Sequence, residues 1–262
     1  SAITLFKKIF GRKTLVNISD LWPLSAVELG AMREGGKIYD IFAWIERYIY
    51  RNADGIFGQS EEIIRHVNQF PSTKNKFVYR NLQQYAVAAQ PKRKHTPFRI
   101  VYAGLLGVAQ DIYSIIENIP FQSIGAEFHL YGGGNQTEKI KEYINKHPGC
   151  FVYYHGYVKK EQIAEELSRY DASIVPLTVA IKGAVPSKIY DLIPIGIPIL
   201  FCGGGEGAEI VSKYYFGMVS KPHDFKQLHN NIIELINLPD EEYSTISKNC
   251  LDMAKNEFDF NK

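Results

Sequence analysis

The feature of this chain that most constrains its fold is an alternation of short β-branched runs with longer amphipathic segments. This pattern is typical of βαβ units, in which parallel strands are joined by helices. In the second half we expect strands at 99–104, 127–132, 151–156, 172–177, 197–201 and 217–220. Helices are expected between and after them at about 110–119, 136–146, 159–170, 186–195, 206–215, 224–237 and 240–257. The second half is therefore predicted to form a complete doubly wound α/β domain.

The first half shows the same alternation but offers only about three strands. We expect these strands at 14–19, 55–60 and 76–81, with helical segments at 20–30, 37–53 and 61–70. No glycine-rich turn comes early in this half, so we interpret it as the back of a Rossmann-like domain whose front is absent. The chain of 262 residues suits two ordinary domains.

A polar, basic, proline-containing stretch marks the expected boundary between the halves. We therefore predict a partial Rossmann-like N-terminal domain at 1–90, a linker at 91–97, and a complete, ligand-binding Rossmann-like domain at 98–238. The remaining segment, 239–262, is expected to be a helix that returns toward the N-terminal domain.

Charge and cysteine content narrow the class of protein. The formal net charge of +2 is too small to favour nucleic acid as a partner. Three cysteines without metal-ligand spacing indicate a reducing compartment, and no apolar run is long enough to span a bilayer. We expect a cytoplasmic protein that binds no metal.

Glycine-rich turns follow three of the expected strands of the second half. "GLLGVAQD" begins with Gly104 and contains Gly107, "GGGNQ" covers 132–136, and "CGGGEGAE" covers 202–209. Carboxyl ends of parallel strands share one edge of a sheet, and glycine lets backbone N–H groups approach a phosphate there. None of the turns is a P-loop or a dinucleotide fingerprint, which argues against an ATPase and a dehydrogenase. The three turns together favour a phosphorylated ligand.

The segment "KGAVPSKIYDLIPIGIPILF" follows the fourth strand and places a lysine, Lys188, three residues before its one carboxylate, Asp191. Pro186 suits a first helical turn, which places Ser187 and Lys188 at a helix N-terminus. Lys188 and Asp191 have the i,i+3 spacing that puts two side chains on one face of a helix. A cation at a helix N-terminus is favoured only when an anion binds beside it, and Asp191 is placed to accept hydrogen bonds from a diol such as ribose. A local ion pair is the alternative interpretation.

These segments resemble the donor-binding domain of family 4 glycosyltransferases, in the branch that builds bacterial surface polysaccharides. The resemblance rests on "VPSKIYDLIPIGIPIL", "GGGEGAEIV", "YAGLLGVAQDIYSIIE" and "VYYHGYVKKEQIAEELSRYDASIVPL". Upstream, "DLWPLSAVELG", "YIYRNADGIFGQS" and "VYRN" resemble elements of the acceptor-side domain, in family order and spacing.

The resemblance implies a GT-B fold with two Rossmann-like domains. It also implies transfer of a sugar from a nucleotide-sugar donor to a glycan or lipid-linked acceptor, and a UDP-sugar is the donor it favours. It implies retention of anomeric configuration and no metal. Asp191 would bind the ribose hydroxyls, and Lys188 would be the catalytic cation on the diphosphate. Donor contacts are implied for Gly104, Gly107, Ser187, Lys188, Asp191, Gly204, Gly205 and Glu206.

The chain departs from the family pattern at several positions. Gly183 stands where the first carboxylate of the paired-glutamate motif is expected, and Leu105 stands where the branch usually has asparagine. The family's early acceptor loop and histidine have no counterpart, so the chain as given is expected to be an inactive fragment. A degenerate, non-catalytic nucleotide-sugar-binding module is the main alternative, followed by a purely structural role and by a sugar-nucleotide epimerase.

The segment 37–53 combines aromatic and basic residues at helical spacing. Trp44 and Tyr48 beside Arg47 and Arg51 would suit contact with a membrane surface, at the inner face of the cell membrane. Packing in an α/β core explains most of the same residues.

Overall fold

The computed structural model describes residues 7, 9–70, 75–80, 88 and 90–256. The chain divides into two compact units, each with its own sheet. The N-terminal unit comprises Ser1–Asn81 and Val179–Val185, and the C-terminal unit comprises Leu82–Thr178 and Pro186–Lys262. Each unit is described below by itself.

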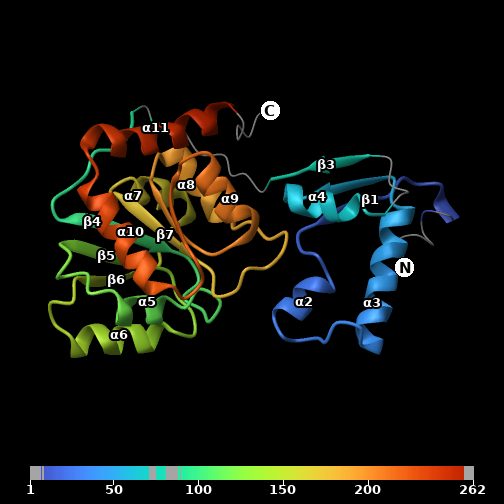
Figure 1. The fold of residues 1–262 in the computed structure, drawn as a ribbon, viewed down its shortest axis with the longest axis horizontal. Helices are drawn as coiled ribbons and strands as arrows, with labels where there is room; N and C mark the ends of the chain where they lie inside the picture. Colours follow the sequence, from blue (N-terminus) through green and yellow to red (C-terminus); the bar gives the residue numbers. More distant parts are fainter. Residues whose placement is uncertain (1–6, 8, 71–74, 81–87, 89, 257–262) are drawn as a thin grey trace. The chain divides into compact units, whose positions relative to one another are not determined.

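The C-terminal unit is built on a six-stranded parallel sheet (Figure 1). Its strands are β4 (Phe98–Ala103), β5 (Ala126–Tyr131), β6 (Val152–Gly156), β7 (Ala172–Pro176), β8 (Ile199–Cys202) and β9 (Gly217–Ser220). They lie in the order β6-β5-β4-β7-β8-β9, so the chain leaves β4 in one direction and later resumes at β7 on its other side. The doubly wound domain is confirmed. Its topological switch point, where such sheets bind ligands, lies between β4 and β7.

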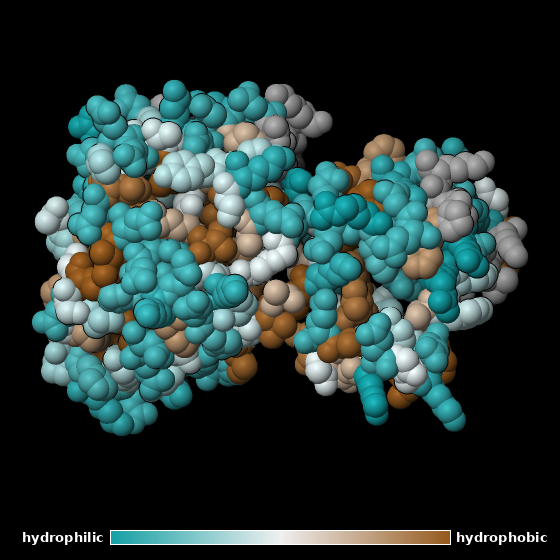
Figure 2. Space-filling model, viewed as in Figure 1, coloured by the Kyte–Doolittle hydropathy of each residue, from teal (hydrophilic) through white to brown (hydrophobic). Residues whose placement is uncertain are grey.

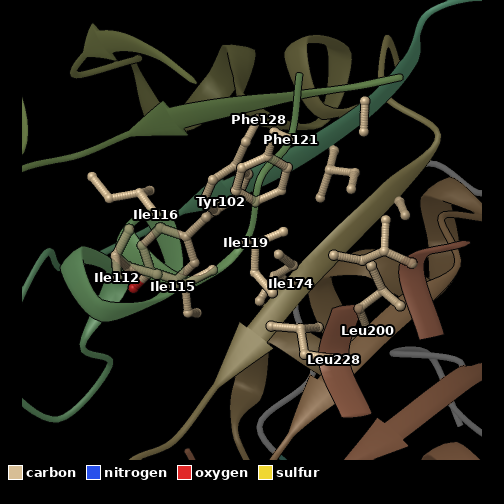
Figure 3. Packing of buried hydrophobic residues seen from close by; sticks show 14 of the residues in the cluster. Tyr102, Ile112, Ile115, Ile116, Ile119, Phe121, Phe128, Ile174, Leu200 and Leu228 are labelled. Atoms are coloured by element: carbon tan, nitrogen blue, oxygen red, sulfur yellow. The ribbon is translucent and has the colours of Figure 1, made fainter. Parts of the chain in front are cut away.

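Helices cover both faces of this sheet. They are α5 (Ile112–Asn118), α6 (Thr137–Lys146), α7 (Ile163–Leu167), α8 (Ser187–Leu192), α9 (Gly205–Lys213), α10 (Phe225–Asn237) and α11 (Asp240–Asn256), with 3-10 turns η1 (Lys160–Gln162) and η2 (Ile193–Ile195). Apolar residues of α5, α6 and α10 pack on one face in the main core. Figure 3 shows Ile112, Ile115 and Ile116 of α5 lying against residues of this core. Within it, Phe121 and Phe128 stack with ring centroids 4.8 Å apart.

The N-terminal unit holds a smaller sheet of three parallel strands, in the order β1-β2-β3. Its elements are β1 (Leu15–Ile18), α2 (Leu24–Glu28), α3 (Lys37–Asn52), β2 (Gly55–Gly58), α4 (Glu61–Val67) and β3 (Lys76–Val78). Ser60 caps the N-terminus of α4, because its Oγ accepts a hydrogen bond from Ile63 N at 3.1 Å. Leu21, Ile56, Ile63 and Val67 are fully buried in this unit's own core.

The surface of the N-terminal unit carries hydrophobic residues around α2 and α3 (Figure 2). Ile38, Ile41 and Trp44 of α3 are about 60% exposed, at 63%, 59% and 60%. Arg47 and Arg51 are exposed on the same helix. The predicted amphipathic helix is therefore present, and contact with a membrane stays a prediction. Among the described residues, no helix has the length and apolar character needed to cross a bilayer.

The division between the units differs from the predicted boundary at residue 90. The basic stretch 91–97 is bonded to the C-terminal unit instead of acting as a free linker. Lys94 Nζ donates to the carbonyl oxygens of Ile236 and Leu238 at the end of α10. The buried carboxylate of Asp171 accepts from His95 N, His95 Nδ1 and Arg99 N at 2.7–3.0 Å.

The tail helix α11 packs against η2 within the C-terminal unit. Its predicted return toward the N-terminal domain stays a prediction, and the last residues of the predicted segment, 257–262, lie outside the described residues.

Candidate functional site

The turns that follow β4 and β5 pack directly on each other at the carboxyl edge of the C-terminal sheet. Gly104 N donates to Tyr131 O at 2.9 Å, and Leu106 N donates to Gly133 O at 3.0 Å. A Cβ at Gly132 would lie 1.9 Å from Gly104 O, and φ is +119° there. This close backbone approach requires glycine. Two of the three predicted glycine turns, those that follow β4 and β5, therefore meet at this edge of the sheet.

Lys188 reaches this place from α8. A Cβ built on Gly104 would lie 2.6 Å from Lys188 Nζ and Cε, so the tip of the lysine rests against the bare glycine backbone. The ammonium lies 5.8 Å from the centre of the Tyr102 ring, whose hydroxyl donates to Leu105 O. Burial lowers the pKa of Lys188, against an opposing effect of Asp191. Sequence spacing thus correctly placed this cation next to the first glycine turn.

Asp191 lies one helical turn after Lys188 and is also half-buried. Its Oδ1 atom is buried and has no hydrogen-bond partner. Burial raises the pKa of Asp191 to about 6, although the Lys188 and Lys160 ammonium groups oppose that rise. No ion pair within 4.0 Å joins Lys188 to Asp191 in the described part of the chain. Lys188 and Asp191 therefore do not form the local ion pair that was the alternative interpretation. The Asp191 carboxylate keeps one oxygen, Oδ1, free to accept a hydrogen bond.

Both side chains line one cavity between α7, α8 and the ends of the central strands. Its apolar wall is formed by Ala103, Ile163, Ala164, Leu167, Leu192 and Ile195. A second, more open hollow adjoins it through Ala103 and Ile163 and extends over the glycine turns to Tyr131, Tyr157 and Val158. The two hollows together present a polar pair, a glycine floor and an apolar, aromatic rim, the usual composition of a small-molecule site.

The remaining predicted donor-binding residues near Lys188 lie at the N-terminal ends of α8 and α9. Pro186 is the N-cap of α8 and not its first residue, and Ser187 is the first residue. Gly204 is the N-cap of α9 and Gly205 its first residue, with φ +64°. A Cβ on Gly207 of α9 would lie 3.4 Å from Pro186 Cδ, so the starts of α8 and α9 are adjacent.

Glu206 and Gly107 do not line the cavity that holds Lys188 and Asp191. Glu206 is only 5% exposed, so its side chain points into the protein. Gly107 lies beside Gln110, whose Oε1 would be 3.1 Å from an added Cβ. Their predicted donor contacts stay predictions.

Tyr157 lines the more open hollow but was not among the residues predicted from the sequence. It is 82% exposed and its hydroxyl lies over Gly133, where an added Cβ would be 2.2 Å away. The signal was present in the sequence, because Tyr157 directly follows the strand predicted at 151–156, at the same sheet edge. Its neighbours Val158 and Ile163 line the same hollow.

Gly183, at the position of the absent carboxylate, is held within the N-terminal unit. Its N–H donates to Glu62 Oε2 at 2.7 Å, and its carbonyl accepts from Ser60 Oγ at 2.8 Å. Lys182 N donates to Glu28 Oε2 at 2.8 Å in the same way. We call residues Val179–Val185 the strap, because backbone hydrogen bonds fix this excursion of the chain to the N-terminal unit.

Metal ligands do not gather in the described ranges: no group of three or more His, Cys, Asp or Glu side chains there could hold an ion.

Comparison with solved structures finds a similar fold in three proteins. HepE from Anabaena, solved with UDP, matches 98% of this chain and 71% of its own, with TM-score 0.73 and 15% identity. The apo lipopolysaccharide outer core galactosyltransferase WaaB matches 98% of this chain and 78% of its own, with TM-score 0.61 and 15% identity. A mutant of S. aureus TarM, in a complex that includes UDP, matches 86% of this chain with TM-score 0.63 and 19% identity.

The chain spans less than half of the length of the TarM chains, at 45% and 47%. No curated protein matches the chain significantly. The family model for "Glycosyl transferases group 1" matches residues 97–238, which is more than half of the chain and contains the three glycine turns, Lys188 and Asp191. The chain belongs to the group 1 glycosyltransferase family and has its GT-B type α/β fold.

Proposed function

We propose that this chain binds a UDP-sugar and is part of an enzyme that transfers the sugar to a glycan or lipid-linked acceptor. The observation that carries the proposal is the buried, unpartnered Asp191 Oδ1 in one cavity with Lys188. A buried polar atom without a partner is costly, and it is best explained by a ligand that supplies the missing donor. A ribose hydroxyl supplies that donor, and a diphosphate supplies the anion that a half-buried lysine lacks.

The choice of uridine is supported by the relatives of similar fold, HepE and TarM, which were solved with UDP. Retention of configuration and a role in surface polysaccharide synthesis come from the sequence resemblance alone and remain part of the proposal, as do a cytoplasmic location, contact of α3 with the membrane and the absence of a metal requirement.

The chemistry of the site is electrostatic. As the bond between sugar and diphosphate lengthens, negative charge grows on the departing phosphate and the sugar becomes oxocarbenium-like. Lys188 Nζ beside Gly104 is placed to stabilise that charge in a site partly shielded from water, where such contacts are strong. Asp191 would orient the nucleoside through its ribose hydroxyls and would not contact the phosphate whose bond breaks.

The direct test is calorimetric titration of the 262-residue chain with UDP, GDP and ADP. We expect UDP to bind and the other two to bind at least about tenfold more weakly, since a pocket that hydrogen-bonds one base leaves polar groups unpaired with another. Absence of binding by all three diphosphates would contradict the proposal. Binding of all three with equal affinity would retain the phosphate site and reject the choice of uridine.

Affinity for UDP-glucose is expected to fall as the pH is lowered through about 6. Asp191 has a raised pKa of about 6, so its carboxylate is ionised and accepts hydrogen bonds above that pH, and is protonated below it. UDP-glucose is the right probe because both of its phosphates are esterified and do not titrate in this range. The terminal phosphate of UDP itself has a second pKa of about 6.

Asp191→Asn is the matched control for this pH series. It keeps one acceptor oxygen and does not titrate, so its affinity should be weaker than that of the wild type at pH 7.5 and nearly flat down to pH 5. An identical pH profile in the wild type and in Asp191→Asn would exclude Asp191 as the group responsible.

One observation favours the alternative of a non-catalytic binding module. The strap holds Gly183 at φ +80° with both backbone groups bonded, so the position of the first motif carboxylate is used for structure. Glycosyl transfer, or slow hydrolysis of UDP-glucose, by the intact protein would dismiss this alternative. Tight UDP binding without turnover would support it.

A further inference from the structure

A separate, smaller cavity, distinct from the two hollows near Lys188, lies in the C-terminal unit between α5, α10 and the ends of three strands. Cys202 ends β8, Ser220 ends β9, and Leu177 and Thr178 follow β7. Ile115 of α5 and Leu228 of α10, both labelled in Figure 3, form part of its apolar wall. The cavity leaves about 20 Å³ for the centre of a water-sized group, enough for a single oxygen.

Two of the residues that line this cavity each have a buried side-chain oxygen without a hydrogen-bond partner, Gln110 Oε1 and Ser220 Oγ. Ser220 is only 2% exposed. Its hydroxyl lies close enough to the Cys202 thiol to oppose the rise of that group's pKa, which burial takes to about 12. A thiol is a weak partner, so the hydroxyl is left without a strong one.

The loops that close this cavity contain backbone strain. Asp111 has φ +44° and His223 has φ +57°, left-handed values that non-glycine residues seldom adopt. Such strain is typical of sites where the surrounding structure fixes an unfavourable backbone for function. The strain supports a site here but does not identify the ligand.

The charges around the cavity indicate what kind of group it takes. Asp111 accepts from Gln136 Nε2 at 2.8 Å and lies 4.0 Å from His223 Nδ1, and Asp224 caps α10. Lys221 is the only lysine or arginine among the lining residues, whereas Asp111 and Asp224 supply two carboxylates. The cavity is therefore unfavourable for a phosphate. Gln110 Oε1 requires a donor, and Ser220 Oγ can donate or accept. A neutral O–H group satisfies both.

We propose that the cavity of Gln110 and Ser220 binds one neutral hydroxyl oxygen, which donates to Gln110 Oε1 and accepts from Ser220 Oγ. The oxygen has two possible sources: a resident water, or a hydroxyl of the sugar carried by the nucleotide. The second source rests on the proposed function. It has a structural basis, because the loop that begins at Gly104, against Lys188, passes Gly107 and ends beside Gln110. Cys202 likewise directly precedes the glycine turn that opens α9.

The test compares UDP and UDP-glucose binding by the wild type, Ser220→Ala and a control, Ser212→Ala, on the exposed side of α9. If the sugar supplies the hydroxyl, Ser220→Ala should weaken UDP-glucose by about 2- to 12-fold, the effect of one neutral hydrogen bond, and leave UDP unchanged. If water supplies it, both affinities should stay unchanged. A high-resolution crystal structure of the wild type without nucleotide should then show an oxygen between Gln110 and Ser220, absent in Ser220→Ala.

The inference is overturned if that space is empty with and without UDP-glucose and Ser220→Ala changes neither affinity. Equal weakening of UDP and UDP-glucose by Ser220→Ala would also reject it, because the serine would then act on the nucleotide. Failure of the wild type to bind UDP contradicts the proposed function instead, and the crystallographic search for the oxygen remains informative in that case.

Discussion

Lys188→Ala is expected to weaken UDP binding by about 10- to 150-fold, the effect of losing hydrogen bonds to a charged group. The side chain lies against Gly104 with its ammonium in the cavity that also holds Asp191. In an intact, active enzyme the same change should lower kcat by about 10²–10³-fold, as removal of one oxyanion-stabilising donor does. Calorimetry on this chain measures the first effect, and steady-state kinetics measures the second.

The unliganded fold should tolerate this change. Burial already lowers the pKa of Lys188, which means that its charge is disfavoured in the folded protein. Removing the charge therefore costs little without a ligand, and the melting temperature is expected to stay within a few degrees. Lys213→Ala, at the exposed end of α9, is the matched control and should leave UDP affinity unchanged. A similar loss of affinity in both variants would point to general charge attraction and would exclude a specific role for Lys188.

The fold of the C-terminal unit could be predicted because its signals are local. The run "GMVS" between two helical patterns marks β9 at 217–220, and the six predicted strands all appear in the sheet. Parallel strands end at the same edge, so the meeting of Gly104, Gly132 and Lys188 followed from chain order alone. Spacing on one helical turn was also enough to place Asp191 and Lys188 on the same cavity.

Two domains were predicted, but the assignment of residues 179–185 to the N-terminal unit and of 91–97 to the C-terminal unit could not be, because the bonds that decide both join distant residues. Gly183 is 121 residues from Glu62, and Lys182 is 154 residues from Glu28. The basic stretch at 91–97 looked like a linker because its partners are not adjacent either; Lys94 bonds the end of α10, 142 and 144 residues away. Polar sequence alone does not distinguish a solvated side chain from one that caps a remote helix.

The unpaired state of Asp191 Oδ1 is a second feature that sequence could not give. The i,i+3 spacing was compatible with an ion pair to Lys188, and only the geometry of the cavity shows that the two groups stay apart. The distinction matters for function, because a carboxylate already satisfied by lysine would have little capacity left for a diol.

Gly183→Glu puts a carboxylate at the position where the family motif has its first one, yet it is expected to destabilise the protein by about 2–5 kcal/mol. The residue has φ +80°, which costs a non-glycine residue about 1–2 kcal/mol. A Cβ there would lie 2.8 Å from Ile63 Cγ1 in the core of the N-terminal unit, and overpacking adds about 1–3 kcal/mol. The backbone hydrogen bonds to Glu62 and Ser60 would be strained as well. Chemical denaturation of the 262-residue chain measures the change.

Two alanine variants separate these contributions. Gly35→Ala has nearly the same backbone conformation, φ +73°, in the same unit, and nothing lies within 4 Å of its added Cβ. It should cost only the conformational part, about 1–2 kcal/mol. Gly183→Ala should cost more than Gly35→Ala because of the contact with Ile63, and Gly183→Glu should cost at least as much as Gly183→Ala.

A Gly183→Glu protein as stable as the wild type, with tighter UDP-glucose binding, would show that the strap can yield and that the site lacks only its carboxylate. The expected loss of stability without a gain in binding would instead mean that the strap has replaced the family's first carboxylate by a structural anchor. Any catalysis at the cavity of Lys188 and Asp191 would then proceed without the first carboxylate of the family motif.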